Sequence, residues 1–529
     1  MSVFQVDGFA FFNNFECANL ANVARGNPSG TSADGGGKAV NFAFNVWTSP
    51  DAAGTAFENK NRSWFCFGVT GGPGNCWIEL TVMNMNRQKR LFNQGMMPAY
   101  MVLPSQPYWD RIPGKPVTYY YIGPDFVVTF QFKMPIDPGA EVYFAMTYPH
   151  NNAKIMAITD RLTSKFLCSS SIYFHREFLC YSAEGRRLDL LTISSFDGIG
   201  AEGEFEDPFD LTPLEEMADM KGNISQSMPR CFPGKKVIFI SSRVHPGEVQ
   251  ATYVLNGFLK FLLSDSDPRA FLLRKAFIIP NLNPDGVVRG HYRTDHRGVN
   301  LNRVYQAPCP LHHPTIFATR VLFMYHAAQS RKGAPDKEEE CDDQGFTVPA
   351  ETEDITTVES SQAVNRAFTG QVEEGIKSLS KVVKDEACQA VQERAASLDE
   401  ETQTASVLMK TCEIQAEKSK DACSKYEDRA DVPNYELSEL EDCWMRRLKA
   451  EVQKRSGGGT SWIKTTEECG IFLYLDLHGH ASKRGTFVYG NHMEDTDSAT
   501  EALMFPKIMA LNCSHFDFAG CDFRKGNTK

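Results

Sequence analysis

Residues 236–248 read KVIFISSRVHPGE, and the fold of the chain is organised around this stretch. The apolar run Val237–Ile240 is typical of a strand buried in a sheet, and a short polar turn leads from it to His245 and Glu248. Residues 249–263 then carry apolar side chains at helical intervals. The sequence therefore predicts a strand, a loop and a helix, with the His and the Glu where the loop meets the helix. Ligands of open α/β sheets bind at this carboxyl end of the strands.

An imidazole and a carboxylate three residues apart supply two of the three protein ligands that a catalytic zinc site needs. Taken alone, the pattern H-x-x-E recurs by chance, and a solvated surface pair is its commoner meaning. Residues further along the chain decide between these two interpretations.

Length and composition limit the classes of protein that the chain can represent. Its 529 residues, 42% of them hydrophobic, predict two to four domains with ample core. The sequence has no apolar run long enough to span a membrane, and its first residues do not resemble a signal peptide. We therefore expect a cytoplasmic protein whose 15 cysteines are reduced.

The net charge of −11 is concentrated in one segment. Residues 331–460 contain 29 acidic and 18 basic side chains, which leaves 37 of each sign in the rest of the chain. The remainder has no basic stripe that would predict nucleic-acid binding. The segment itself is poor in aromatic residues and rich in charge, a composition that predicts a disordered acidic insertion.

Residues 1–155 have the sequence pattern of an all-β domain. Short aromatic stretches with alternating patterns are separated by turns such as TGGPGN. This pattern predicts an antiparallel β-sandwich. The expected strands are 39–47, 62–70, 76–85, 116–123, 126–134 and 141–149.

From residue 156 the sequence pattern changes to that of an α/β domain. A hairpin is expected over 172–195, and a second buried strand at 276–280. After the insertion, Ile471–His480 reads IFLYLDLHGH, an apolar strand with a third candidate ligand at its carboxyl end. Alternating strands and helices predict an α/β domain with a largely parallel sheet. We assign residues 156–330 to its first part and 461–529 to a second, incomplete part.

The candidate metal ligands are His245, Glu248 and His478. Two imidazoles and one carboxylate suit Zn²⁺, with a fourth position left for water, as in the known His₂Glu site of carboxypeptidase A. The insertion accounts for most of the sequence between Glu248 and His478. Arg293, Asn302 and Arg303 add groups that can bind a carboxylate, since guanidinium groups bind carboxylates through two parallel hydrogen bonds.

Five motifs in this order resemble the M14 metallocarboxypeptidases, in particular their cytosolic branch: RVHPGE, NPDG, HYR, GVNLNR and DLHGH. The β-rich leader ending in YFAMTYP is similar to the extra N-terminal domain of that branch. The resemblance covers nearly all of the chain outside 331–460. The stretch DLHGHASKRGTFVYGN is most similar to the type-5 members, which trim glutamates from tubulin tails, including the branch-point residue.

The resemblance implies a carboxypeptidase-type mixed sheet with flanking helices and one zinc ion per chain. It also implies microtubule association, with the nucleus as a further location besides the cytoplasm. His245, Glu248 and His478 would hold the zinc. Arg293 would polarise the scissile carbonyl, while Asn302 and Arg303 would hold the terminal carboxylate of the substrate. The sequence adds Lys483 and Arg484 as candidate cations for a glutamate side chain, although solvated loop charges are the simpler interpretation.

The sequence departs from the family after His478. The family carries its general-base Glu on a strand well downstream, and no acid after His478 lies on a strand that resembles it. The acids in question are Glu494, Asp495, Asp497, Glu501, Asp517 and Asp522. We therefore expect the base to be missing, the chain to be a truncated isoform or a fragment, and its activity to be impaired.

Three functions remain open at this stage. The first is a zinc carboxypeptidase that removes glutamates from acidic tails such as polyglutamylated tubulin or other glutamate-rich proteins. The second is an inactive isoform that binds such tails without cutting them. The third is an aspartoacylase-like amidohydrolase for a small molecule, which the large β-rich leader disfavours. In each case we expect a monomer without nucleic-acid or membrane partners.

Overall fold

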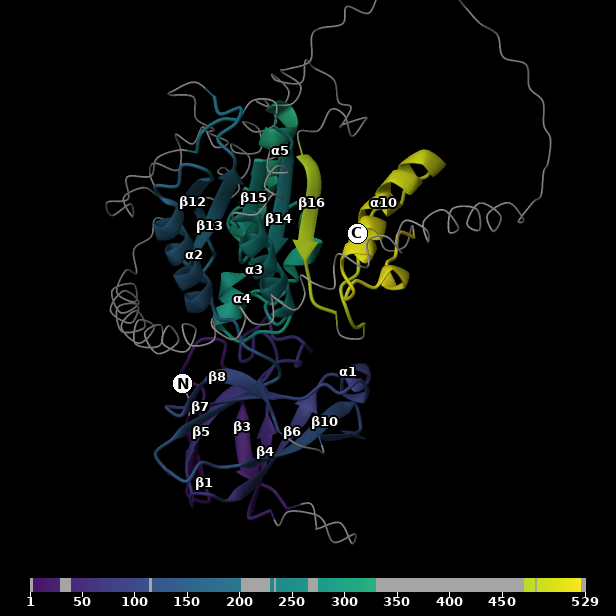
Figure 1. The fold of residues 1–529 in the computed structure, drawn as a ribbon. Coiled ribbons are helices and arrows are strands. Elements are labelled where there is room, and N and C mark those ends of the chain that lie inside the picture. Colours follow the sequence, from purple (N-terminus) through teal and green to yellow (C-terminus); the bar gives the residue numbers. More distant parts are fainter. Residues whose placement is uncertain are drawn as a thin grey trace, which may run out of the picture. The chain divides into compact units, whose positions relative to one another are not determined.

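The computed structural model describes residues 3–28, 40–113, 117–200, 229–232, 235–264, 275–329, 471–480 and 483–524. These residues form two sheets at the N-terminal end and one sheet beyond it (Figure 1). The predicted insertion, 331–460, lies outside the described residues. Among the helices of the described ranges, none is both long and apolar enough to cross a membrane.

The N-terminal residues form a sandwich of two sheets, as the sequence predicts. The first sheet has the order β1 (Val3–Val6), β2 (Phe9–Phe12), β5 (Cys66–Gly71), β11 (Glu141–Ala145), β7 (Ala99–Leu103) and β8 (Gln106–Arg111). The second has the order β3 (Asn22–Arg25), β4 (Phe42–Trp47), β6 (Trp77–Met85), β10 (Asp125–Lys133) and β9 (Thr118–Ile122). A short helix, α1 (Lys89–Asn93), follows β6.

Aromatic side chains that alternate along these strands fill the space between the two sheets. Phe11 and Phe67 from the first sheet and Phe44 and Phe130 from the second are fully buried in one core. Burying a Phe side chain contributes roughly 1.5–3 kcal/mol, so such side chains are major contributors to the stability of the sandwich. The period of two along the sequence is therefore the signal that predicted this domain correctly.

One pair of strands departs from the antiparallel prediction. β4 and β6 run parallel, with Phe44 opposite Leu80, while the other pairs in both sheets are antiparallel. The reason is that β5, which lies between them in sequence, belongs to the opposite sheet. The chain thus crosses the sandwich and returns in its original direction, a connection that parallel pairing requires.

The third sheet is mixed, with helices on both faces. Its order is β12 (Tyr173–Tyr181), β13 (Arg187–Ser194), β15 (Lys275–Ile279), β14 (Val237–Ser242) and β16 (Ile471–Leu477). β14 pairs in parallel with both β15 and β16, whereas β12 and β13 pair antiparallel. The helices are α2 (Asn152–Phe166), α3 (Gln250–Leu262), α4 (Pro284–Val288), α5 (Pro314–Gln329) and α10 (Thr496–Asn512), with 3₁₀ turns η4 (Leu301–Arg303) and η7 (Phe518–Gly520).

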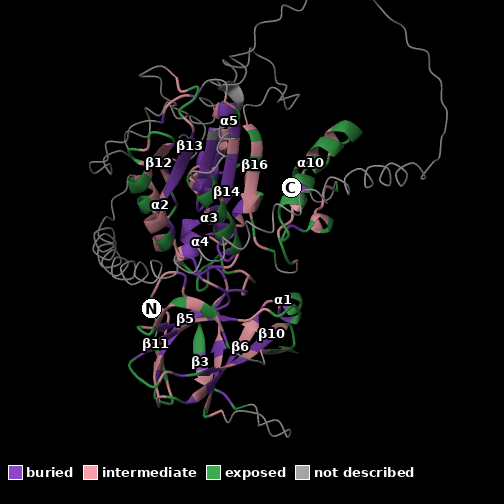
Figure 2. Ribbon diagram, in the orientation of Figure 1, coloured by how far each residue is buried: buried purple, intermediate pink, exposed green. Residues whose placement is uncertain are grey.

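β14 is central because both of its faces are covered. Phe239 belongs to the core that includes Ile316 and Leu322 of α5, whereas Ile240 belongs to the core that includes Leu255 of α3. Figure 2 shows the resulting layer of buried strands between the helices. A strand buried on both faces reads as a continuous apolar run, which explains the composition of this stretch.

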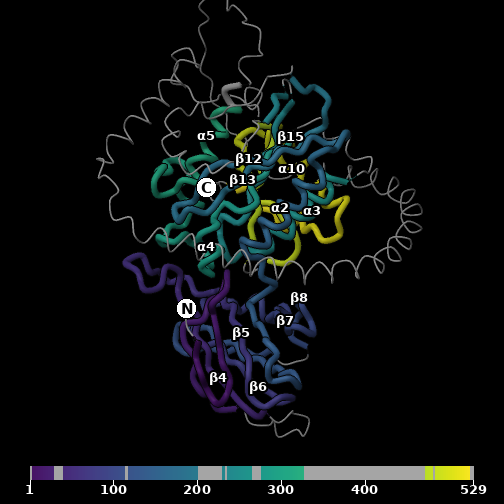
Figure 3. The backbone as a smooth tube through the Cα atoms, turned by 90° about the vertical axis from the view of Figure 1, so that its left-hand side faces the viewer, coloured from purple at the N-terminus to yellow at the C-terminus, as the bar shows by residue number. Residues whose placement is uncertain are grey.

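Residues far apart in sequence meet in this sheet. β16 joins directly beside β14, with Asp476 opposite Ser241, although more than two hundred residues separate them (Figure 1). Figure 3 shows the same sheet after a turn of 90°, with β12, β13 and β15 labelled. The predicted hairpin, the helix after Glu248 and the buried strand at 276–280 are confirmed as β12–β13, α3 and β15. The expected boundary after residue 155 falls inside α2, whose contacts include β12 of the third sheet.

Candidate metal centre

The loop after β14 is buried and held in place by an arginine. Arg243 adopts a left-handed backbone conformation with φ 61°, which is unusual for a residue with a side chain. Its guanidinium group donates to the carbonyl oxygens of Pro246 (3.0 Å from Nε) and His150 (2.9 Å) and to Thr252 Oγ1 (3.0 Å). Burial lowers the pKa of Arg243 to about 10. The hydrogen bonds fix the turn that presents His245, and the sequence analysis did not identify this role.

His245, Glu248 and His478 converge at the carboxyl ends of β14 and β16. Glu248 lies between the two imidazoles: its Oε1 is 2.9 Å from His245 Nδ1, and its Oε2 is 2.9 Å from His478 Nδ1. One ligand atom from each of the three residues lies within 4.8 Å of the others. The motifs thus predicted correctly which three side chains come together.

The hydrogen bonds behind the two imidazoles decide which nitrogens face the centre. His245 Nε2 lies 3.0 Å from Asn300 Oδ1, an acceptor, and His478 Nε2 lies 2.8 Å from Asp476 Oδ2. Each Nε2 can therefore donate a hydrogen bond outward, so that a metal ion at the centre would be bound through the two Nδ1 atoms. Such outward hydrogen bonds are the usual support of metal-binding histidines.

A buried polar atom tests whether a metal ion fits this centre. His245 Nδ1 is fully buried and has no hydrogen bond of acceptable geometry, although Glu248 Oε1 is only 2.9 Å away. A nitrogen lone pair that points at a carboxylate oxygen without a proton between them is stabilised by a cation placed between the two atoms. Two imidazole nitrogens and a carboxylate are also the donor set that zinc prefers, so the residues fit the ion.

The electrostatics of the centre favour positive charge. Burial raises the pKa of Glu248, but hydrogen bonds and charge from His245 and His478 outweigh it and hold this pKa well below the usual range. Burial lowers the pKa of His478, yet Asp476 and Glu248 raise it to about 10. The two carboxylates thus keep a positive charge beside them, whether a proton or a metal ion supplies it.

Arg293, a predicted site residue, lies beside this cluster. Its Nη1 is 3.8 Å from Glu248 Oε1, and its side chain is 31% exposed, so it is accessible from solvent. Asn302 and Arg303 lie in η4, directly after Asn300, whose side chain supports His245. The guanidinium group of Arg303 donates to the backbone oxygen of Asn302 (2.9 Å) and is otherwise exposed.

Comparison with known proteins agrees with this donor set. The sequence profile of the Peptidase_M14 family, zinc carboxypeptidases, matches residues 170–437. The chain belongs to the M14 zinc carboxypeptidase family. The resemblance noted from the motifs is thereby confirmed.

Several relatives of the chain belong to the cytosolic branch of the zinc carboxypeptidases. The chain is 36% identical over 543 residues to cytosolic carboxypeptidase-like protein 5 of Bos taurus, a match that covers 98% of this chain and 54% of the relative. The human protein of that name is 35% identical over 544 residues, with the same coverage. Human cytosolic carboxypeptidase 6 is 33% identical over 291 residues, 54% of this chain and 49% of the relative. The chain thus spans about half the length of the curated type-5 relatives that it matches.

The chain is also similar to solved carboxypeptidase structures. A metallo-carboxypeptidase from Burkholderia cenocepacia is 20% identical, with a TM-score of 0.41, and the match covers 60% of this chain and 67% of that one. A putative carboxypeptidase A from Shewanella denitrificans is 22% identical, with a TM-score of 0.39, and covers 59% and 64%.

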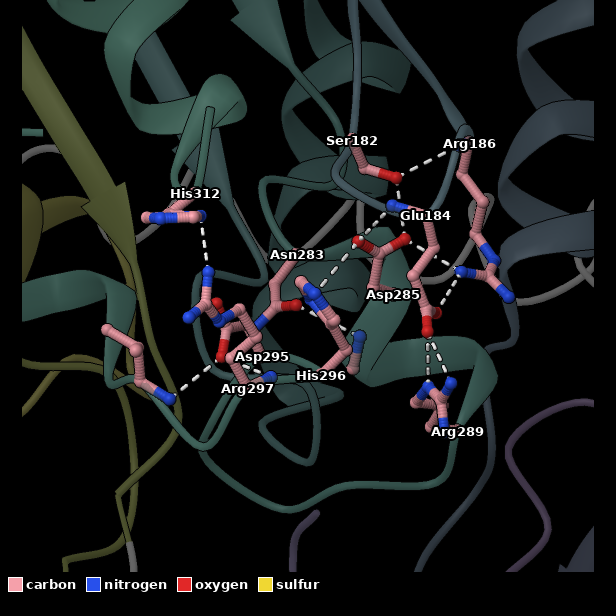
Figure 4. A network of polar contacts seen from close by, with 12 residues as sticks. Ser182, Glu184, Arg186, Asn283, Asp285, Arg289, Asp295, His296, Arg297 and His312 are labelled. Carbon is pink, nitrogen blue, oxygen red and sulfur yellow. Dashed lines mark hydrogen bonds and ion pairs between the residues drawn. The ribbon is translucent and has the colours of Figure 1, made fainter. Parts of the chain in front are cut away.

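The N-P-D-G motif supplies Asn283 and Asp285 to a network of polar contacts (Figure 4). Asn283 accepts a hydrogen bond from Gly286 N (3.0 Å) at the start of α4 and donates to the carbonyl oxygen of Val244 (3.2 Å), next to His245. Asp285 accepts from Ser182 Oγ (2.6 Å) and from Arg186 Nη1 (2.7 Å) of the β12–β13 hairpin. The motif therefore ties the zinc-ligand loop to the antiparallel edge of the sheet.

The two basic residues after β16 contact residues other than the three ligands. Lys483 Nζ donates to the carbonyl oxygen of Gly520 (2.6 Å) and lies 4.7 Å from the ring centre of Phe487. Arg484 is exposed, and its Nη2 lies 3.9 Å from the point where a Cβ on Gly95 would stand. Their role toward a substrate stays a prediction.

The acids after His478 have other contacts or are exposed. Asp495 and Asp517 cap helical turns by accepting from Ser498 N (2.7 Å) and Gly520 N (3.0 Å). Asp522 pairs with Arg524 (2.9 Å from Nε). Glu494, Asp497 and Glu501 are exposed near the start of α10. Within the described residues, the group of potential metal ligands contains none of these six.

Proposed function

We propose that the chain acts as a zinc carboxypeptidase on acidic polypeptide tails and removes glutamates from their ends. The observation that carries the proposal is the convergence of His245 Nδ1, His478 Nδ1 and the Glu248 carboxylate, with Arg293 3.8 Å from that same carboxylate. The relatives named cytosolic carboxypeptidase-like protein 5 support a cytosolic protein of this class. Polyglutamylated tubulin tails, including their branch-point glutamates, are the substrate class that we propose.

The side chains around the metal would divide the work of peptide hydrolysis. A zinc ion held by the three ligands would supply a Lewis acid that activates water and polarises a carbonyl. Arg293 would place a positive charge beside the carbonyl oxygen, where negative charge develops as water adds. Asn302 and Arg303 would bind the free carboxylate of the chain end.

The choice of a glutamate-rich substrate rests on further positive charge. Lys483 and Arg484 follow β16, the strand that brings His478 to the centre. Cations at this side of the site would attract an acidic tail and disfavour a basic one. The same charges make binding dependent on salt, because exposed pairs are screened within about 8–10 Å at physiological ionic strength.

A second candidate function is binding of acidic tails without cleavage. It is favoured by one observation: within the described residues, the group of His245, Glu248 and His478 contains no second carboxylate that could serve as a general base. General-base catalysis typically contributes 10²–10⁴-fold, so an active centre without it would turn over slowly. We therefore expect weak glutamate release by residues 1–529.

A single assay separates these functions. Zinc-loaded and chelator-treated protein are incubated with a peptide that carries a branched polyglutamate tail, and released glutamate and bound peptide are both measured. Zinc-dependent release supports the carboxypeptidase, and binding without release supports the binding function. If the protein neither releases glutamate nor binds the peptide, both functions are contradicted. Hydrolysis of N-acetylaspartate in a parallel reaction would support a small-molecule amidohydrolase.

A further inference from the structure

The segment that carries Arg293 lies against an aspartate of the N-terminal sandwich. Asp51 follows β4 and is 1% exposed. Its Oδ1 accepts a hydrogen bond from the backbone N–H of Tyr292 (2.6 Å), and its Oδ2 accepts from the N–H groups of Arg293 (2.8 Å) and Thr294 (2.9 Å). The hydroxyl of Thr294 donates to the same oxygen (3.1 Å). One carboxylate thus binds three consecutive backbone N–H groups, with Arg293 in the middle.

Such an arrangement requires a charged acceptor in a fixed place. Hydrogen bonds to a carboxylate are about twice as strong as those between neutral groups, and two oxygens can accept all four protons. The turn around Asp51 is itself constrained: Ala52 has a φ of 56°, and its N–H donates to His291 Nε2 (3.1 Å). Backbone strain of this kind is found where the surrounding structure holds a functional geometry.

The opposite side of the same segment contacts the zinc-ligand loop. The carbonyl oxygen of Tyr292 accepts from Gly247 N (2.8 Å), the residue between the first two ligands. A Cβ on Gly247 would stand 2.6 Å from Tyr292 Cδ2, so only glycine permits this close approach. A continuous path of hydrogen bonds therefore runs from Asp51 through the backbone at Tyr292 to the loop of His245 and Glu248.

Neighbouring contacts between the two regions involve the backbone as well. Asn19 Nδ2 donates to the carbonyl oxygen of Gly290 (3.0 Å), and Asn59 Nδ2 lies 3.2 Å from Thr294 Oγ1. A Cβ on Gly290 would stand 2.3 Å from the carbonyl oxygen of Ala18, which leaves no room for a side chain. The sandwich thus defines the path of the backbone on both sides of Arg293.

We propose that Asp51 is a positioning residue of the active site, so that the N-terminal sandwich completes the catalytic centre from outside the third sheet. Asp51 does not touch the substrate. It fixes the backbone from which the Arg293 side chain reaches toward Glu248, and thereby fixes where positive charge meets the scissile carbonyl. The consequence for catalysis rests on the proposed carboxypeptidase function, whereas the placement of the segment does not.

The test compares two substitutions that each remove one negative charge from the sandwich. Asp51→Asn keeps the size of the side chain but replaces one accepting oxygen with an NH₂ group. This donor faces backbone N–H groups, which are donors as well, and cannot accept their hydrogen bonds. Asp125→Asn is the matched control, because Asp125 pairs with Arg62 (2.7 Å) on the same domain and is about one-third exposed. Hydrogen exchange of the full chain, followed by mass spectrometry, reports on the segment 288–298 without requiring any activity.

In Asp51→Asn we expect the amides of 292–294 to exchange at least about tenfold faster than in the wild type, with the strands of the third sheet unchanged. Asp125→Asn should leave the segment unchanged. Thr294→Val removes one of the four hydrogen bonds and should produce a smaller change in the same peptide. It also serves as the deciding variant if Asp51→Asn does not fold. Unchanged exchange in the folded variants would overturn the proposal.

Kinetics then separate positioning from general stability. In the zinc-loaded Asp51→Asn protein, well below its melting temperature, we expect kcat for glutamate release to fall about 10- to 100-fold, the scale of a displacement on the order of 1 Å. KM should stay within about twofold, because the carboxylate-binding residues are elsewhere. Release at the wild-type kcat would refute the positioning role. If the wild type itself releases no glutamate, the proposed function fails, while the exchange experiment still decides whether Asp51 holds the segment.

Discussion

The outward support of His478 gives a sharp test of the metal centre, through the substitution Asp476→Asn. Asp476 Oδ2 lies 2.8 Å from His478 Nε2, and its Oδ1 accepts from Ser241 Oγ (2.9 Å). The Asn carbonyl oxygen can still accept from Nε2–H. Its amide group can donate to Ser241, because a hydroxyl can also accept. Both hydrogen bonds can therefore survive, and the change removes mainly a negative charge.

The expected loss of zinc affinity follows from that geometry. Removal of an outer partner of a metal-binding residue typically lowers affinity 10- to 100-fold, or about 1.4–2.7 kcal/mol. We expect Asp476→Asn in this range. Ser241→Ala should have a smaller effect, since it leaves the charge of Asp476 in place. Loss of the ligand itself in His478→Ala should abolish stoichiometric binding.

Zinc affinity is measured by competition with a chromophoric chelator, for the wild type and each variant at the same pH. Asp522→Asn is the control: it removes a carboxylate from the same part of the chain, but one that pairs with Arg524. Wild-type affinity in Asp476→Asn would refute the claim that this carboxylate supports His478 as a ligand. An equal loss in the control would show that the overall charge of the chain, not the charge of Asp476 beside His478, determines the affinity.

Three further predictions concern stability and domain organisation. Arg243→Met should reduce the free energy of unfolding by about 2–5 kcal/mol in chemical denaturation, because buried carbonyl oxygens such as that of Pro246 lose their donor. The control Arg25→Met, at an exposed position, should change the free energy of unfolding little, and equal effects would contradict the role of Arg243. For Glu184, burial raises the pKa, but Arg289 and Arg186 outweigh burial and hold the pKa below its usual value. The ionised Glu184 therefore stabilises the fold above the unfolded pKa of about 4.3, and this stabilisation is lost as pH falls through the lower folded pKa. Glu184→Gln should therefore be less stable than the wild type at pH 7, and the difference should shrink in acid; a difference that persists at low pH would contradict this. Replacing 335–458 by a short linker should preserve zinc binding, as the composition of the segment predicts, and failure of the shortened protein to fold would show that the segment is structural.

The sequence predicted the three ligands because each stands at the end of an apolar strand or at the start of a helix. Such local patterns can be recognised in the sequence without knowledge of the fold. Asp51 could not be found in this way: in sequence it reads as part of a turn, and its partners at Tyr292–Thr294 are about 240 residues away. Arg243 was missed for a related reason, since a basic residue after a strand suggests solvent, whereas its guanidinium group is buried.

The fold was predictable to the same extent. The strands with long aromatic alternation, such as β6 and β10, were found close to their true limits. Short strands such as β1 and β3, of four residues each, have too few alternations to be recognised. The parallel pairing of β4 with β6 depends on which sheet receives β5, and this is a tertiary choice that no local pattern determines. Helix α10, which follows β16, was also not predicted.

The central claim is that His245, Glu248 and His478 together hold one zinc ion, and X-ray absorption at the zinc edge of the purified protein tests it most directly. The account predicts one zinc per chain, with nitrogen and oxygen neighbours at about 2.0–2.2 Å and two imidazoles in the first shell. It also predicts loss of this signal in both His245→Ala and His478→Ala. The chain contains 15 cysteines, so sulfur ligands at about 2.3 Å are a real alternative. Sulfur in the first shell, or a full zinc signal in either variant, would contradict the account.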